Sequence, residues 1–105
     1  MRAPATPATL GGSGRELWRS LVARYVWTSE QLSLVTILCE TRDRIEEARA
    51  AIARDGAFLR PAKGGKLAVR AHPALKAEKD AKTSFVSTWK ALGLDLSTLS
   101  GKEPH

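Results

Sequence analysis

The sequence predicts a mainly α-helical protein that carries one short β-hairpin, and three observations lead to this prediction. Apolar residues recur at helical spacing near the start, in the middle and near the end of the chain. The stretch from Ser29 to Asp55 contains neither proline nor glycine, as expected of a long uninterrupted helix. After Gly56, two short apolar runs flank a Gly-Gly pair, which is the pattern of a hairpin. We therefore expect a helical hairpin with a long second helix, followed by the β-hairpin and a third helix.

The first helix is expected over residues 14–26, because its apolar residues fall on one helical face. These residues are Leu17, Trp18, Leu21, Val22 and Tyr25. The preceding residues 1–13 are rich in Ala, Pro, Thr and Gly, so we expect a flexible N-terminal arm there. One small helical domain is placed over residues 14–96, and a loose C-terminal tail over residues 97–105.

The second helix is expected over residues 29–55. Thr28 followed by Gln31 is the pattern of a capping box, in which each side chain bonds to the backbone of the other residue. The seven-residue spacing of Leu38 and Ile45 suits a long helix that packs against another at a shallow angle. Gly56 is expected to end the helix in the left-handed conformation.

The hairpin is expected between Phe58 and Ala71, with its turn near Gly64 and Gly65. Pro73 suits the first position of a third helix, which Gly93 should end. The inner face of that helix is predicted to hold Leu75, Lys82, Phe85, Val86, Trp89 and Leu92. Side chains expected to be largely buried in the assembly are Trp18, Leu38, Ile45, Phe85 and Trp89.

No catalytic, cofactor-binding or metal-binding pattern is found. Lys66 follows two glycines but is followed by Leu67, so the phosphate-loop pattern is absent. His72 lacks a partner at metal-ligand spacing and, because it precedes a proline, is interpreted as a helix-capping or packing residue. The single cysteine, Cys39, is interpreted as a small buried apolar residue. We therefore predict a protein that is not an enzyme and that binds no cofactor or metal ion.

The chain is basic, with 17 Lys and Arg against 11 Asp and Glu, for a formal net charge of +6. No apolar run is long enough to span a bilayer and no leader is recognised, so we expect a cytoplasmic protein with no membrane partner. From Arg54 to Lys82, eight basic residues stand against three acidic ones, for a net charge of +5. Such a concentration of charge favours a nucleic-acid partner, although a lysine-rich solubilising surface is the alternative. The residues predicted to bind DNA are Arg60, Lys63, Lys66, Arg70, Lys76 and Lys79.

Five stretches occur in a recognisable order. They are residues 16–19, the helix from Leu32 to Gly56, the turn at 62–66, the segment His72-Pro73-Ala74-Leu75-Lys76, and Leu92-Gly93-Leu94. On these stretches, and over roughly residues 14–96, the chain resembles the phage terminase small subunit family. The resemblance implies a homo-oligomeric ring that binds double-stranded viral DNA in the host cell cytoplasm. It also implies that the chain regulates a large terminase subunit, which holds the ATPase and the nuclease.

Two other functions are compatible with these residues. A helical protein-interaction module could use the same basic surface to bind an acidic protein partner. A small transcriptional regulator is disfavoured, because no pair of helices is joined by the short turn of a helix-turn-helix motif. The oligomeric mass would separate the terminase subunit from both alternatives.

Overall fold

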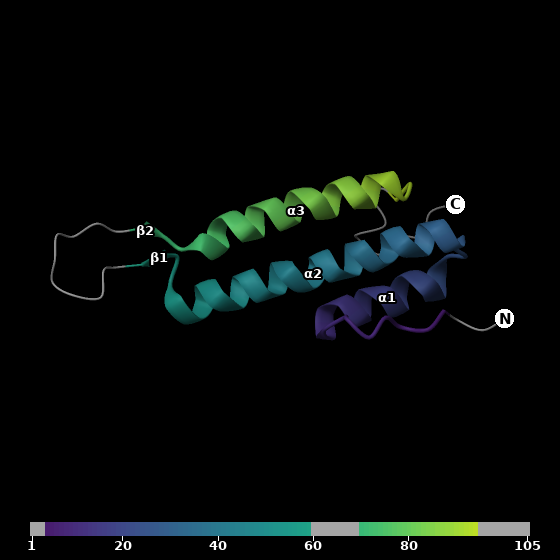
Figure 1. The fold of residues 1–105 in the computed structure, drawn as a ribbon, viewed down its shortest axis with the longest axis horizontal. Helices are drawn as coiled ribbons and strands as arrows, with labels where there is room; N and C mark the ends of the chain where they lie inside the picture. Colours follow the sequence, from purple (N-terminus) through teal and green to yellow (C-terminus); the bar gives the residue numbers. More distant parts are fainter. Residues whose placement is uncertain (1–3, 60–69, 95–105) are drawn as a thin grey trace, which may run out of the picture.

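The computed structural model describes residues 4–59 and 70–94, which form three helices and a two-stranded sheet. The helices are α1 (Gly12–Arg24), α2 (Ser29–Asp55) and α3 (Pro73–Ala91), and the strands are β1 (Phe58–Leu59) and β2 (Arg70–Ala71). The long helix α2 lies between the other two, and α1 and α3 each run antiparallel to it (Figure 1). The predicted mainly α fold with a helical hairpin, a β-hairpin and a third helix is confirmed.

Helix α1 begins and ends two residues earlier than predicted. Its start depends on Asp43 of α2, whose carboxylate accepts hydrogen bonds from the backbone N–H groups of Gly11 at 2.6 Å and Gly14 at 2.7 Å. Just before the helix, the Leu10 side chain is only 3% exposed. The segment expected to be a flexible arm, residues 1–13, therefore includes a core side chain and the start of α1.

Helix α2 has the predicted limits and the predicted cap. The Gln31 N–H donates to Thr28 Oγ1 at 3.2 Å, and the Thr28 N–H donates to Gln31 Oε1 at 2.8 Å. At the other end, Gly56 has φ +84° and ψ 155°. The expected left-handed helical conformation is therefore wrong in ψ, although the positive φ still favours glycine.

The two predicted strands are present. They pair antiparallel, with Phe58 opposite Ala71 and Leu59 opposite Arg70. The turn predicted at Gly64 and Gly65 lies outside the described residues. Helix α3 begins at Pro73 as predicted, and its end is followed by Gly93 at φ +80°.

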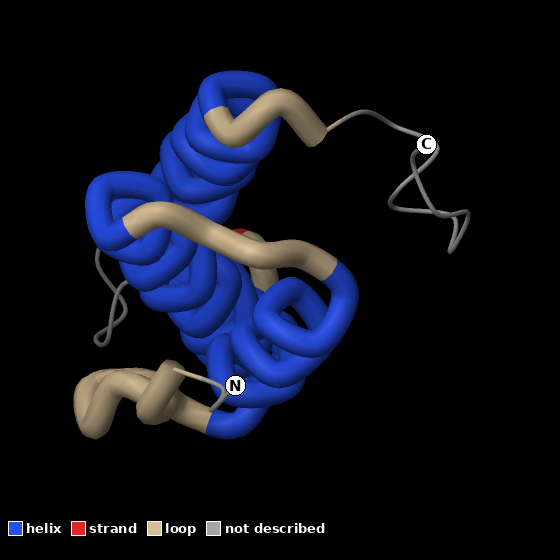
Figure 2. The backbone as a smooth tube through the Cα atoms, turned by 90° about the vertical axis from the view of Figure 1, so that its right-hand side faces the viewer, coloured by secondary structure: helices blue, strands red, loops and turns tan. Residues whose placement is uncertain are grey.

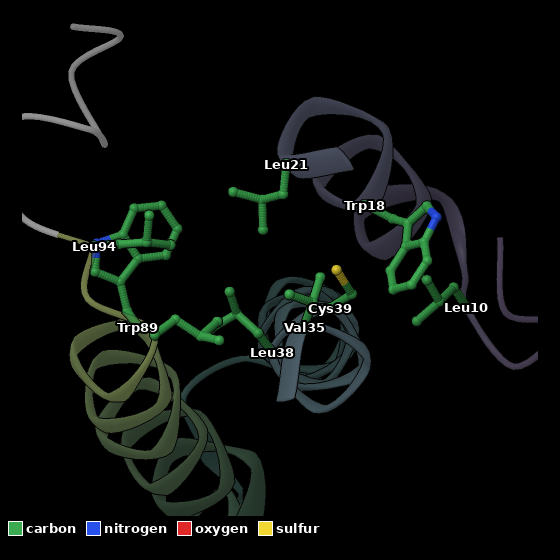
Figure 3. Packing of buried hydrophobic residues seen from close by; sticks show 9 residues of the cluster. Leu10, Trp18, Leu21, Val35, Leu38, Cys39, Trp89 and Leu94 are labelled. Atoms are coloured by element: carbon green, nitrogen blue, oxygen red, sulfur yellow. The ribbon is translucent and has the colours of Figure 1, made fainter. Parts of the chain in front are cut away.

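The core lies mainly along the first half of α2. Figure 3 shows Leu10 and Trp18 on one side of this helix and Trp89 and Leu94 on the other. The predicted burial of Trp18, Leu38, Ile45 and Trp89 is confirmed within a single chain. The core cluster consists of Leu10, Trp18, Leu21, Val35, Leu38, Cys39, Trp89, Leu92 and Leu94.

Three side chains assigned to the inner face of α3 are less buried than predicted. Phe85 is half-buried and stacks on Trp89, with ring centroids 5.7 Å apart. Val86 is 46% exposed, and the side chain of Lys82 is 50% exposed. Each helical residue turns by about 100°, so Val86 lies to the side of the stripe that Phe85 and Trp89 bury.

Cys39 is fully buried, as the interpretation of it as a small apolar residue requires. Burial raises the pKa of its thiol to about 12, and the nearby Asp43 and Glu40 carboxylates add to this shift. The thiol is therefore protonated, and unreactive as a nucleophile, at physiological pH.

Candidate nucleic-acid interface

His72 fixes the geometry at the base of the basic hairpin. Its Nδ1 accepts a hydrogen bond from the Ala74 N–H at 2.9 Å, and so caps α3. Because Nδ1 is an acceptor, the proton lies on Nε2, which contacts Asp55 Oδ2 at 3.0 Å. The His72 N–H also donates to the Ala57 carbonyl at 2.8 Å. The predicted capping role is confirmed, and the same residue ties the start of α3 to the end of α2.

The carboxylate of Asp55, the last residue of α2, is contacted by two basic side chains. Arg54 donates from Nε at 3.1 Å and from Nη2 at 3.2 Å, and His72 contacts the same carboxylate. The hydrogen bonds from Arg54, and then that from His72, lower the pKa of Asp55 to about 2. The carboxylate therefore stays charged at physiological pH and offsets the positive charge of Arg54.

A second group of ion pairs offsets basic residues between α2 and α3. Glu46 bonds to Arg42 and to Arg49, each at 3.3 Å. Glu78 of α3 accepts from Arg49 Nε at 3.0 Å and lies 3.5 Å from Lys82 Nζ. The hydrogen bond from Arg49 contributes most to lowering the pKa of Glu78. Glu78 is thus directed toward α2 and offsets Lys82, but it forms no ion pair with Lys76 or Lys79.

Three of the predicted DNA-binding residues lie within the described chain, and all three are exposed. Arg70 lies on β2, and Lys76 and Lys79 lie one turn apart near the start of α3. Within the described residues none of the three forms an ion pair. Arg60, Lys63 and Lys66 fall in residues 60–69, outside the described part of the chain.

Lys90, on α3, was not among the site residues predicted from the sequence. Lys76, Thr83 and Lys90 are spaced by seven residues, which is close to two helical turns, so they share the outer side of α3. All three are exposed. This row of side chains spans about 21 Å along the helix, at 1.5 Å per residue. The seven-residue spacing was the signal in the sequence that could have identified Lys90.

These features define a small helical protein whose outer α3 surface is cationic. In the part of the chain that the structure describes, no group of three or more His, Cys, Asp or Glu side chains could hold a metal ion. None of the described helices is both long and apolar enough to cross a membrane.

The family model for the small subunit of phage terminase matches residues 15–101, which is most of the chain. The chain therefore belongs to the phage terminase small subunit family. The match starts within the first turn of α1 and runs past the end of α3, so it includes most of α1 and the whole of α2, β1, β2 and α3. No curated protein and no solved structure matches the chain.

Proposed function

We propose that this terminase small subunit is an oligomeric adaptor that binds double-stranded viral DNA and regulates the large terminase subunit in the host cytoplasm. Membership of the family supports this role, because small subunits of this family are generally non-catalytic adaptors. The observation that carries the DNA-binding part is the selective pairing of charges. Arg42, Arg49, Arg54 and Lys82 have carboxylate partners, whereas Arg70, Lys76 and Lys79 are exposed without an ion pair among the described residues.

Exposed cations without a carboxylate partner suit phosphate binding for an energetic reason. A lysine that leaves an ion pair to reach a phosphate loses one favourable contact as it gains another. A lysine that is only hydrated gains the phosphate contact and releases condensed counterions from the DNA. Binding through Arg70, Lys76 and Lys79 is therefore expected to be electrostatic and to show little sequence preference.

The hairpin would extend this surface. Arg60 follows β1 directly, and Lys63 and Lys66 lie between the paired strands in the sequence. We include all three in the proposed interface, because Leu59, which directly precedes Arg60, pairs with Arg70 in the antiparallel sheet. In a ring, each subunit repeats this interface, so weak contacts from each subunit would add up to tight binding.

The test compares DNA affinity across a range of salt concentrations for the natural chain and for the variant Lys76→Glu/Lys79→Glu. The logarithm of the DNA-binding constant falls with the logarithm of the salt concentration. Loss of two phosphate contacts should make this slope less steep by about 1.8, at roughly 0.9 per contact. The affinity should fall alike for unrelated DNA sequences. Circular dichroism should show unchanged helicity, because both side chains are exposed.

A matched variant, Arg15→Glu/Arg19→Glu, makes the same change in charge on the exposed side of α1. It is expected to alter DNA affinity much less. If the α1 variant loses DNA binding and the α3 variant keeps it, DNA binds near the N-terminus instead. If neither variant changes the affinity, an electrostatic interface on these helices is wrong.

A further inference from the structure

Two shallow hollows of opposite charge lie on different parts of the chain. The first, named here the α3 hollow, is lined by Lys82, Thr83, Val86, Ser87 and Lys90. The second, named the α2 hollow, lies between α2 and the segment that precedes α1, and is lined by Thr9, Leu10, Gly11, Glu40, Asp43, Arg44 and Glu47. Two lysines give the α3 hollow a charge of +2. Three carboxylates and one guanidinium give the α2 hollow a charge of −2.

The charged residues of the two hollows are spaced alike. Lys82 and Lys90 are eight residues apart, which is about 12 Å along a helix. Glu40 and Glu47 are seven residues apart, or about 10.5 Å. Around the helix axis the two lysines point about 80° apart and the two glutamates about 20° apart. If α3 of one molecule lies beside α2 of another, both lysine–glutamate pairs can form together when the long, flexible lysine side chains make up this difference. Val86, midway between the lysines and 46% exposed, would be covered by the same contact.

The two hollows cannot meet within one chain. Figure 2 shows the segment before α1 and the helix α3 on opposite sides of α2, and Figure 1 shows the same arrangement. A contact between an α3 hollow and an α2 hollow must therefore join two copies of the chain. Each copy would offer a different surface to each of its neighbours, which is the kind of interface that closes into a ring when the rotation allows.

We infer that the α3 hollow of one subunit binds the α2 hollow of the next, so that the occupant of each hollow is a second copy of this chain. The inference rests on the oligomeric part of the proposed function and places its subunit interface. Complementary charge and matched spacing favour a second copy over DNA as the occupant. The α2 hollow would repel phosphates, and an exposed Val86 adds nothing to a phosphate contact.

This arrangement uses Lys90, at one end of the cationic row on α3, for assembly, and leaves the proposed DNA-binding residues Lys76 and Lys79 free. Lys76 and Lys79 lie at the start of α3, next to the hairpin, whereas the α3 hollow begins at Lys82. The Lys82 side chain is half-exposed, so it can retain Glu78 at 3.5 Å and still reach a neighbour. The two hollows would thus serve assembly, and the hairpin end would serve DNA.

The test uses two charge-reversed variants of the full chain. In Glu40→Lys/Glu47→Lys both hollows are basic, and in Lys82→Glu/Lys90→Glu both are acidic. Each variant alone should lose the assembly and run near the 11.4 kDa of one chain in light scattering. An equimolar mixture should assemble again, because every basic hollow then finds an acidic one on the other variant.

Two controls separate assembly from folding and from DNA binding. The variant Lys76→Glu/Lys79→Glu carries the same reversal on the same helix and should keep the mass of the natural assembly. Because Glu40 also accepts a hydrogen bond from Thr9 Oγ1 at 3.1 Å, the single variant Glu47→Lys is measured as well, since it leaves that bond in place. Circular dichroism confirms that each variant is helical.

The outcomes are distinct. If the natural chain assembles and both reversed variants keep its mass, this interface is wrong while the proposed function stands. If the folded variants dissociate but their mixture stays monomeric, the two hollows do not face one another. A natural chain that is monomeric at micromolar concentration would overturn both the interface and the proposed oligomer. Binding of DNA to that monomer would still test the proposed nucleic-acid interface.

Discussion

Replacing Gly14 with alanine tests the contact between α1 and α2. The expected change in the free energy of unfolding is opposite in sign to the change that helix propensity gives. Alanine within a helix is ordinarily more stable than glycine by about 1 kcal/mol. At Gly14, however, an added Cβ would lie 2.7 Å from the Cys39 carbonyl oxygen and would also meet Asp43 Oδ2. The carbonyl belongs to the backbone of α2, so the two helices must move apart to accept the methyl group.

The magnitude follows from two costs and one gain. Overpacking of a tight contact costs about 1–3 kcal/mol. Displacing the Asp43 carboxylate from the Gly14 N–H, which it contacts at 2.7 Å, costs a further 1.5–3 kcal/mol or so. Subtracting about 1 kcal/mol for propensity leaves a net loss of roughly 1.5–5 kcal/mol. At about 4–8 °C per kcal/mol for a domain of this size, the melting temperature should fall by roughly 6–40 °C.

Gly12→Ala is the matched control. Gly12 lies in the same first turn of α1, and no atom lies within 4 Å of the position its Cβ would occupy. This variant should be as stable as the natural chain or more stable, by up to about 1 kcal/mol. Thermal unfolding of both variants is followed by circular dichroism at one protein concentration, because assembly would make the melting temperature depend on concentration. Equal melting temperatures for Gly14→Ala and Gly12→Ala would refute the reasoning.

Three further predictions concern the core, the hairpin base and the thiol. Trp89→Ala should lower the free energy of unfolding by about 3–5 kcal/mol, because the ring is buried, and an unchanged urea midpoint would show otherwise. The folded-state pKa of Asp55, about 2, lies below its ordinary value of 3.8. The stabilisation of the folded state by this ionised carboxylate is therefore complete above about pH 4 and is lost as the pH falls toward 2. Between pH 4 and pH 2, the free energy of unfolding should fall less steeply for Asp55→Asn than for the natural chain. At pH 8 a thiol reagent should modify Cys39 only on unfolding, and rapid labelling of the native protein would contradict its burial.

Much of the fold could be predicted from the sequence because the signals that mark the starts of α2 and α3 are local. The capping box joins Thr28 to Gln31, three residues apart, and the His72 cap reaches only as far as Ala74. A hydrogen bond between a side chain and the backbone over so short a separation is specified by residue types alone. The paired strands were predicted for a similar reason, because a change of apolar spacing followed Gly56.

For the candidate site, residue counts identified where positive charge is concentrated but not which charges are free. Lys82 and Lys79 look alike in the sequence, three residues apart on one helix. Glu78 lies four residues before Lys82, a spacing that places the two side chains side by side on a helix. Only the structure shows that Glu78 is also bound by Arg49, 29 residues away in the sequence. Lys90 was missed because it lies outside the segment that the count covered, although it shares the outer side of α3 with Lys76.

By itself, then, the sequence determined the helices, their caps, the hairpin strands and the sign of the charge near them. The tertiary structure decided where α1 begins, because the backbone N–H groups of Gly11 and Gly14 donate to Asp43, which is 29 residues from Gly14. It decided that Leu10 is buried and that Val86 is exposed, because each depends on where a neighbouring helix crosses. It also placed helix α3 and the segment before α1, which line the two oppositely charged hollows, on opposite sides of α2. Periodicity gives the face on which a residue lies, but only packing between distant segments determines what covers that face.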